Sequence, residues 1–196
     1  NQSTAGVLMP KNFLGCKRLC VDNGYYETFN RDNVALVDLN EHVLEGFTAN
    51  AVMVGARELP VDAVVFATGF DAMTGALNKI SITGRNGQTL RETWSAGPVN
   101  YLGLGINGFP NLFTITGPGS PSVLTNMLVS IQHHVEWITD CLSWLRSNQH
   151  ATIEVSPTAQ DQWVQHVNTV ADATLYQWCS SWYLGANVPG KPRVFM

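Results

Sequence analysis

Apolar residues fall into short blocks in the first half of this chain, and these blocks predict strands. Residues 33–38, 43–48 and 51–54 lie between polar turns, so we expect a short strand followed by a small β-meander. The continuous apolar runs 63–67 and 112–116 are typical of strands that are buried on both faces of a parallel sheet. The pattern therefore indicates an α/β fold.

Beyond Pro121 the apolar residues take the period of helices. One stripe with spacings of three and four is formed by Leu128, Ile131, Val135, Ile138, Leu142 and Leu145. It predicts a helix roughly 35 Å long, at about 1.5 Å per residue. Ser156 and Pro157 suit the N-cap and the first position of a second helix, which we expect to end near Thr174.

Composition and charge exclude several classes of function. Of the 196 residues, 45% are hydrophobic and 13% are charged, as in a well-packed globular protein. The net charge of -4 and the absence of a basic run disfavour nucleic acid as a partner. The longest apolar runs are far shorter than the roughly 20 residues that cross a bilayer, so we expect no membrane partner.

The four cysteines offer neither a zinc site nor a disulfide framework. They are Cys16, Cys20, Cys141 and Cys179. No C-x-x-C pair occurs and no signal peptide precedes them, so we expect reduced thiols in a cytoplasmic protein without a metal site. The chain begins without methionine and ends on an apolar run, so we expect a piece of a longer protein.

Three motifs have a plainer interpretation than the one their letters suggest. Residues 103–108 read G-x-G-x-x-G, but a Pro-containing segment follows in place of a helix, which favours a glycine-rich connection over a phosphate loop. Ser120, a histidine and Asp140 lack the G-x-S-x-G spacing of a hydrolase. His133 and His134 are adjacent on a helix and diverge, so we expect partly exposed polar residues there.

Residues 62–75 contain A-T-G-F-D-A-M-T-G, and further motif segments extend over nearly the whole chain. These are residues 16–18, 24–33, 97–98, 101–103, 108–113, 117–121, 181–183 and 185–191. Together they resemble Baeyer-Villiger flavin monooxygenases of the phenylacetone and cyclohexanone type. The resemblance implies an enzyme that inserts one oxygen atom of O2 into a ketone, giving an ester or lactone, with FAD and NADPH as cofactors.

The resemblance also assigns roles to residues that are unremarkable alone. Arg18 corresponds to the catalytic arginine, while Lys17 and Trp182 would contact NADP. The expected FAD contacts are Thr68, Gly69, Gly117 and Met127. The expected border of the ketone pocket is Ser122, Val123 and Leu124. A guanidinium suits the catalytic position because it stabilises anionic oxygen without acting as a proton source.

In fold, the resemblance implies part of a two-dinucleotide-binding-domain flavoprotein, with Rossmann-like parallel sheets, the meander and carboxy-terminal helices. Residues 1–61 would close the NADP-binding domain and residues 62–196 the FAD-binding domain. The family's two nucleotide-binding loops and its F-x-G-x-x-x-H-x-x-x-W fingerprint are missing from this sequence. We therefore expect the catalyst to require an amino-terminal half as its partner.

Two alternatives stay open. A flavin N-hydroxylase shares A-T-G but would not need the Lys17–Arg18 block or the Trp182 segment. A non-catalytic fragment would only complete the flavin domain of another polypeptide. Bound flavin in the purified protein would separate an enzyme from such a fragment.

Overall fold

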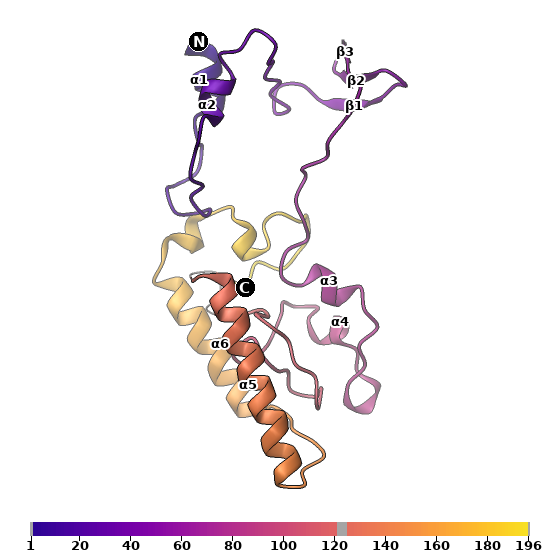
Figure 1. Ribbon diagram of the computed structural model, residues 1–196, viewed down its shortest axis with the longest axis vertical. Helices are drawn as coiled ribbons and strands as arrows, with labels where there is room; N and C mark the ends of the chain where they lie inside the picture. Colours follow the sequence, from indigo (N-terminus) through magenta and orange to yellow (C-terminus); the bar gives the residue numbers. More distant parts are fainter. Residues whose placement is uncertain (1, 121–124, 196) are drawn as a thin grey trace. The chain divides into compact units, whose positions relative to one another are not determined.

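A computed structural model describes residues 2–120 and 125–195 (Figure 1). The chain divides into two compact units. The amino-terminal unit comprises Asn1–Phe13 and Arg18–Gly69, and the carboxy-terminal unit comprises Leu14–Lys17 and Phe70–Met196. The short segment Leu14–Lys17 thus belongs to the carboxy-terminal unit although it lies early in the chain.

The amino-terminal unit contains two short helices and one small sheet. The helices are α1 (Gln2–Leu8) and α2 (Tyr25–Thr28), and the strands are β1 (Leu44–Phe47), β2 (Ala51–Val54) and β3 (Arg57–Pro60). The strands pair antiparallel in the order β1-β2-β3, which confirms the predicted meander. Ala51 and Val54 at the two ends of the central strand are buried.

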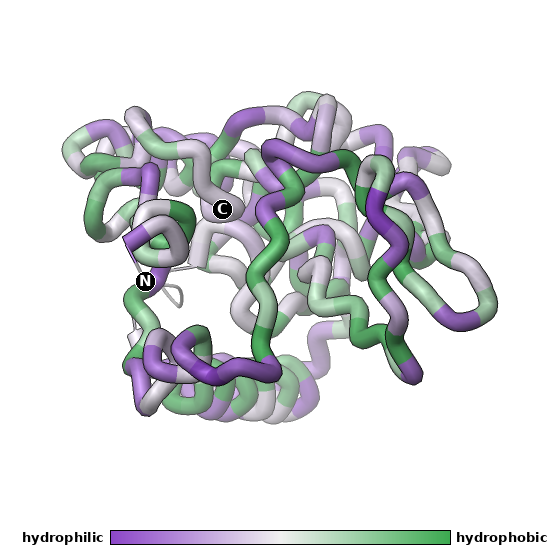
Figure 2. The backbone as a smooth tube through the Cα atoms, turned by 90° about the horizontal axis from the view of Figure 1, so that it is seen from above, coloured by the Kyte–Doolittle hydropathy of each residue, from purple (hydrophilic) through white to green (hydrophobic). Residues whose placement is uncertain are grey.

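Three predicted strands do not form. Residues 33–38 are irregular, and residues 112–116 bond to a neighbouring loop instead of a strand. Residues 63–67 also form no strand, and every residue from 61 to 70 is exposed, with Val65 89% accessible. A buried parallel strand needs a strand on each side. Within the described residues no strand pairs with 63–67, so this apolar stretch stays uncovered. Figure 2 shows several hydrophobic stretches along the backbone.

The carboxy-terminal unit is mainly helical. Its elements are α3 (Gly75–Asn78), η1 (Arg85–Gly87), α4 (Leu90–Thr93), α5 (Met127–Ser147), α6 (Pro157–Asp172), η3 (Leu175–Trp178) and η4 (Trp182–Leu184). Thr89 and Glu92 form a reciprocal capping box that starts α4. The buried core of this unit consists of Leu90, Trp94, Ile106 and Phe109.

Both predicted long helices are present, and α6 begins at its predicted cap. The Ser156 side chain accepts a hydrogen bond from the Ala159 amide, with proline at the first position of α6. The predicted apolar stripe of α5 is largely uncovered. Leu128 near the start of the helix is 76% exposed, whereas Leu145 near its end is buried. This helix therefore exposes an apolar face of the kind that usually packs against the core of a protein.

The G-x-G-x-x-G segment is a connection, as predicted, because residues 107–112 form turns and no helix. Its glycines allow two backbones to approach. The Gly117 amide donates to the Gly103 carbonyl at 3.0 Å, and the Thr114 amide donates to the Leu104 carbonyl at 2.8 Å. A Cβ on Gly103 would lie 3.0 Å from the Gly117 carbonyl oxygen, and a Cβ on Gly105 would lie 2.8 Å from Cγ2 of Val155. These glycines thus have a packing function.

Among the described helices, none is both long and apolar enough to cross a membrane.

Candidate cofactor-binding site

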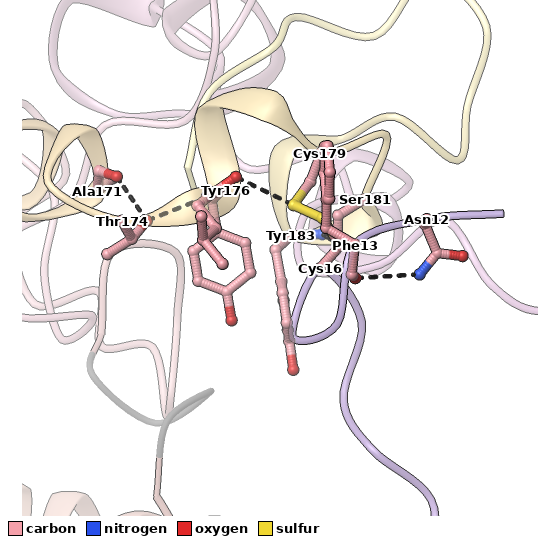
Figure 3. The surroundings of a disulfide bond; sticks show 10 residues. Asn12, Phe13, Cys16, Ala171, Thr174, Tyr176, Cys179, Ser181 and Tyr183 are labelled. Carbon is pink, nitrogen blue, oxygen red and sulfur yellow. Dashed lines mark hydrogen bonds between the residues drawn. A yellow bond between two sulfur atoms is a disulfide. The ribbon is translucent and has the colours of Figure 1, made fainter. Parts of the chain in front are cut away.

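Cys16 and Cys179 form a disulfide, with their Cα atoms 5.4 Å apart (Figure 3). The prediction of four reduced thiols is wrong for this pair, although Cys20 and Cys141 are free. No local pattern signals a link across 163 residues, because tertiary packing alone brings the two cysteines together. The cytoplasmic location inferred from reduced thiols loses this support and stays a prediction.

The disulfide joins the two segments that carry the expected NADP contacts. Lys17 directly follows Cys16, and Trp182 follows Cys179 by three positions, all in the carboxy-terminal unit. Lys17 is exposed and Trp182 is half-buried, so the ammonium group and part of the indole are open to a ligand. Neither residue is a fully buried core residue.

Trp182 opens η4, a short helix whose two ends are closed by hydrogen bonds. At the start, the hydroxyl of fully buried Ser181 accepts from the Tyr183 amide at 3.3 Å. At the end, Gly185 takes a left-handed φ of 71° and its amide donates to the Trp182 carbonyl at 3.0 Å. The rings of Trp182 and Tyr183 have centroids 4.0 Å apart. One side of the indole is therefore packed.

Lys191 connects this carboxy-terminal segment to the A-T-G-F-D motif. Its Nζ donates to Oδ1 of Asp71 at 2.6 Å and to the Ala72 carbonyl at 2.8 Å. Beside it, the Asn187 side chain donates to the Phe70 carbonyl at 2.7 Å. The motif letters alone assign no role to Asp71 or Lys191. The available signal was their presence in two motif segments of the resemblance.

The expected FAD contacts are divided between the units. Thr68 and Gly69 belong to the amino-terminal unit, and both are exposed. Gly69 has a left-handed φ of 84°, and no atom lies within 4 Å of the position that a Cβ would take. Gly117 and Met127 belong to the carboxy-terminal unit, where Gly117 is buried and Met127 is the first residue of α5.

Arg18, the expected catalytic residue, opens the second segment of the amino-terminal unit and is exposed. The expected pocket residues Ser122, Val123 and Leu124 lie outside the described residues. In the part of the chain that the structure describes, no cluster of three or more His, Cys, Asp or Glu could hold a metal ion.

His134 is buried, so the expectation of a partly exposed residue is wrong there, whereas His133 is exposed. Nδ1 of His134 accepts a hydrogen bond from the Thr116 amide at 3.0 Å. Burial, together with the nearby charge of His133, lowers the pKa of His134. A neutral imidazole that supports the backbone before Gly117 has a structural task, which does not fit the hydrolase alternative.

Comparison with curated proteins shows which enzymes the chain is similar to. The chain is 41% identical over 193 residues to a Baeyer-Villiger monooxygenase from Pseudooceanicola batsensis, and 39% identical over 188 residues to cyclohexanone 1,2-monooxygenase from Acinetobacter sp. The chain matches a carboxy-terminal portion of Baeyer-Villiger monooxygenases. These alignments cover 98% and 95% of the chain but 35% and 34% of the relatives, so it spans about a third of their length. No family model matches it.

Two solved structures have the same fold over this region. A steroid monooxygenase bound to NADP is 49% identical with a TM-score of 0.88. The match covers 100% of this chain and 37% of the steroid monooxygenase chain. OTEMO, in complex with FAD and NADP, is 34% identical with a TM-score of 0.90. The match covers 100% of this chain and 36% of the OTEMO chain. The predicted fold class, part of a two-dinucleotide-binding-domain flavoprotein, is confirmed.

One relative bears on the N-hydroxylase alternative. Phenazine N-monooxygenase from Lysobacter antibioticus is 37% identical over 189 residues, which is 96% of this chain and 34% of the relative. An enzyme named for oxidation of nitrogen thus aligns over nearly the same length. The extent of shared sequence therefore does not separate oxidation of a ketone from oxidation of a nitrogen.

Proposed function

We propose that this chain is part of an enzyme that inserts one oxygen atom of O2 into a ketone, giving an ester or lactone, with FAD and NADPH as cofactors. The observation that carries the proposal is the alignment of 98% of the chain with a Baeyer-Villiger monooxygenase at 41% identity. Residues 1–61 are assigned to the NADP-binding domain and residues 62–196 to the FAD-binding domain. The rest of the enzyme supplies the remaining nucleotide-binding loops.

The exposed residues of the candidate site suit NADPH, whose nicotinamide supplies a hydride. The ammonium group of Lys17 is exposed and can contact the 2′-phosphate of the ribose through a charge-assisted hydrogen bond. The half-buried indole of Trp182 offers a flat surface on which a ribose can pack. The disulfide between Cys16 and Cys179 supports this pairing, because it fixes the two segments to one another.

FAD, which activates O2, fits the exposed backbone at Thr68 and Gly69. The open space at the missing Cβ of Gly69 lets a flat ring approach the main chain closely. Met127 adds an apolar contact at the amino end of α5, and the helix dipole there favours negative charge on a ligand. Gly117 is glycine because of its contacts with Thr114 and Gly103, so its contribution is to place the turn before α5.

Arg18 is the residue that we propose to act on the substrate oxygen. A guanidinium can stabilise negative charge on oxygen without acting as a proton source. Ser122, Val123 and Leu124 are proposed to border the ketone.

Oxygen labelling tests the proposal in the complete enzyme that contains this chain. With NADPH, a cyclic or aromatic ketone and 18O2, the ester or lactone should carry one 18O atom. A product without the label, or NADPH oxidation that yields only H2O2 with every ketone tried, would contradict ketone oxygenation.

N-oxygenation of a heteroaromatic nitrogen is a second candidate, which the phenazine N-monooxygenase alignment favours. The same labelling experiment with a phenazine as substrate distinguishes the two. An 18O-labelled N-oxide without any ester from ketones would select N-oxygenation. A purified complete protein without the absorbance of bound flavin would select the non-catalytic alternative.

A further inference from the structure

We infer that Asp71 and Lys191 form a positioning pair that holds η4, and with it Trp182, in the orientation required to bind NADPH. The inference rests on the proposed function for the identity of the ligand. The contacts that support it belong to the carboxy-terminal unit alone.

Lys191 is less exposed than the lysine of an ordinary surface ion pair. The Lys191 side chain is 10% exposed, and its Nζ has two acceptors, Oδ1 of Asp71 and the carbonyl of Ala72. Exposed ion pairs contribute little because both side chains lose freedom and water screens the charges. A nearly buried ammonium group depends on its partners, since removing one leaves a charge that water cannot fully solvate.

The stem of Lys191 transmits this position to η4 through Gly185. A Cβ on Gly185 would lie 3.3 Å from both Cγ and Cδ of Lys191, so the methylene groups pack directly against this glycine. Gly185 is also the residue that ends η4, because its amide donates to the Trp182 carbonyl. A displacement of the Lys191 side chain would therefore disturb the hydrogen bond that closes the helix carrying Trp182.

Asp71 is held in place from the other side by Gly75. A Cβ added to Gly75 would lie 2.6 Å from Cβ and Cγ of Asp71, and the Gly75 amide donates to the Asp71 carbonyl at 3.2 Å. The last glycine of A-T-G-F-D-A-M-T-G thus leaves the space that the carboxylate occupies. Gly75 is the first residue of α3 and does not have a left-handed φ, so its backbone accepts alanine.

The segment that contains Trp182 is consequently fixed at both ends. Cys179 anchors its beginning through the disulfide with Cys16, and Lys191 anchors its end through Asp71. Asn187 adds a contact with the Phe70 carbonyl between them. Loss of the ion pair should release only the end of the segment, so we expect a local change in a folded protein.

The test uses Lys191→Met in the complete enzyme, because methionine keeps the apolar stem and removes the charge. We expect the dissociation constant of NADP+ and the KM for NADPH to rise about tenfold, with kcat changed by less than about twofold. Gly75→Ala should give the same result by displacing Asp71. Arg85→Met is the matched control, because it breaks an exposed ion pair with Glu154 at 2.6 Å elsewhere in the unit.

A second readout follows η4 without any reaction. In protein labelled with 5-fluorotryptophan, Trp182→Phe assigns the 19F signal of Trp182. That signal should shift or broaden in Lys191→Met and Gly75→Ala but not in Arg85→Met. If Lys191→Met does not fold, Asp71→Asn is measured in its place, because it removes the charge and keeps an acceptor oxygen.

The outcomes separate this inference from the proposed function. An unchanged Trp182 signal, or a moved signal with unchanged NADP+ affinity, overturns the positioning pair. A moved signal with weaker NADP+ binding supports it, even in an enzyme that produces no ester from any ketone. In that case the proposed ketone oxygenation fails while the pair stands.

Discussion

The backbone amide of Thr116 donates a hydrogen bond to Nδ1 of His134 on α5, 3.0 Å away. Thr116 has a φ of 51°, which is uncommon for a β-branched residue, and it lies immediately before the buried Gly117. Nδ1 can accept this bond only while it carries no proton, so the neutral ring stabilises the turn.

Stability should therefore fall in mild acid. Burial lowers the folded pKa of His134 below the ordinary value of 6.5, so the unfolded chain binds the proton more tightly. The stabilising effect is complete above pH 6.5 and is lost as the pH falls through 6.5 toward the folded pKa. Calorimetry from pH 8 to pH 5.5 should show a falling Tm.

His134→Asn is the variant to compare, because its Oδ1 can accept the Thr116 amide and cannot titrate in this range. Its Tm should depend less on pH over the same interval. His150→Gln serves as the control, since His150 is exposed. Identical pH profiles for His134→Asn and the wild type would remove His134 as the cause.

The disulfide makes a prediction that needs no activity. Peptide mapping without reductant should recover a linked peptide that contains Cys16 and Cys179, while Cys20 and Cys141 remain alkylable. Cys179→Ser should lower the free energy of unfolding by about 2 to 5 kcal/mol, because a link over a long loop restricts the unfolded chain. Cys141→Ser is the control. Full alkylation of all four cysteines in native protein would contradict the link.

Local sequence patterns were sufficient to predict the elements whose stabilising contacts lie close together in the sequence. The apolar stripe from Leu128 to Leu145, the cap at Ser156 and the short apolar blocks between polar turns predicted α5, α6 and the meander, because those signals act within a few residues. The strands expected at 63–67 and 112–116 failed for the opposite reason. A parallel strand depends on neighbours that are remote in sequence.

The candidate site shows the same difference between local signals, which the sequence carries, and contacts between segments that are remote in sequence. The motif letters single out Lys17, Trp182 and the A-T-G-F-D segment as candidates, and their roles stay predictions. They did not indicate that Cys16 bonds to Cys179 or that Asp71 meets Lys191, since each contact joins segments more than a hundred residues apart. Spacing within a motif carries information about local geometry, and pairing between motifs depends on the tertiary fold.

Lys17→Ala should discriminate between the two nicotinamide cofactors. Only NADPH has a 2′-phosphate, so the loss of a charge-assisted hydrogen bond should cost about 1 to 3 kcal/mol in binding NADPH and little in binding NADH. Steady-state kinetics of the complete enzyme with both cofactors measures this difference. Lys79→Ala is a suitable control, because Lys79 is exposed just after α3. Equal losses for both cofactors would place Lys17 away from the phosphate.

Arg18→Ala tests the catalytic assignment most directly. If the guanidinium stabilises negative charge on oxygen during insertion, its removal should cost roughly 3 kcal/mol or more of transition-state stabilisation. Ester formation should then fall more than a hundredfold, while FAD stays bound and NADPH is still oxidised, because hydride transfer does not develop the same oxyanion. Product analysis by gas chromatography, together with NADPH consumption, gives both rates.

The control for Arg18 is Arg57→Ala, which removes an exposed guanidinium from β3 of the same unit. It should leave ester formation unchanged. Arg18→Lys adds a second comparison, because lysine keeps a positive charge but replaces the planar fork with a titratable ammonium group. We expect it to recover part of the lost rate at most. A normal ester yield from Arg18→Ala would mean that Arg18 has no part in the chemistry, and its cost would then be limited to the roughly 1 kcal/mol of a surface contact.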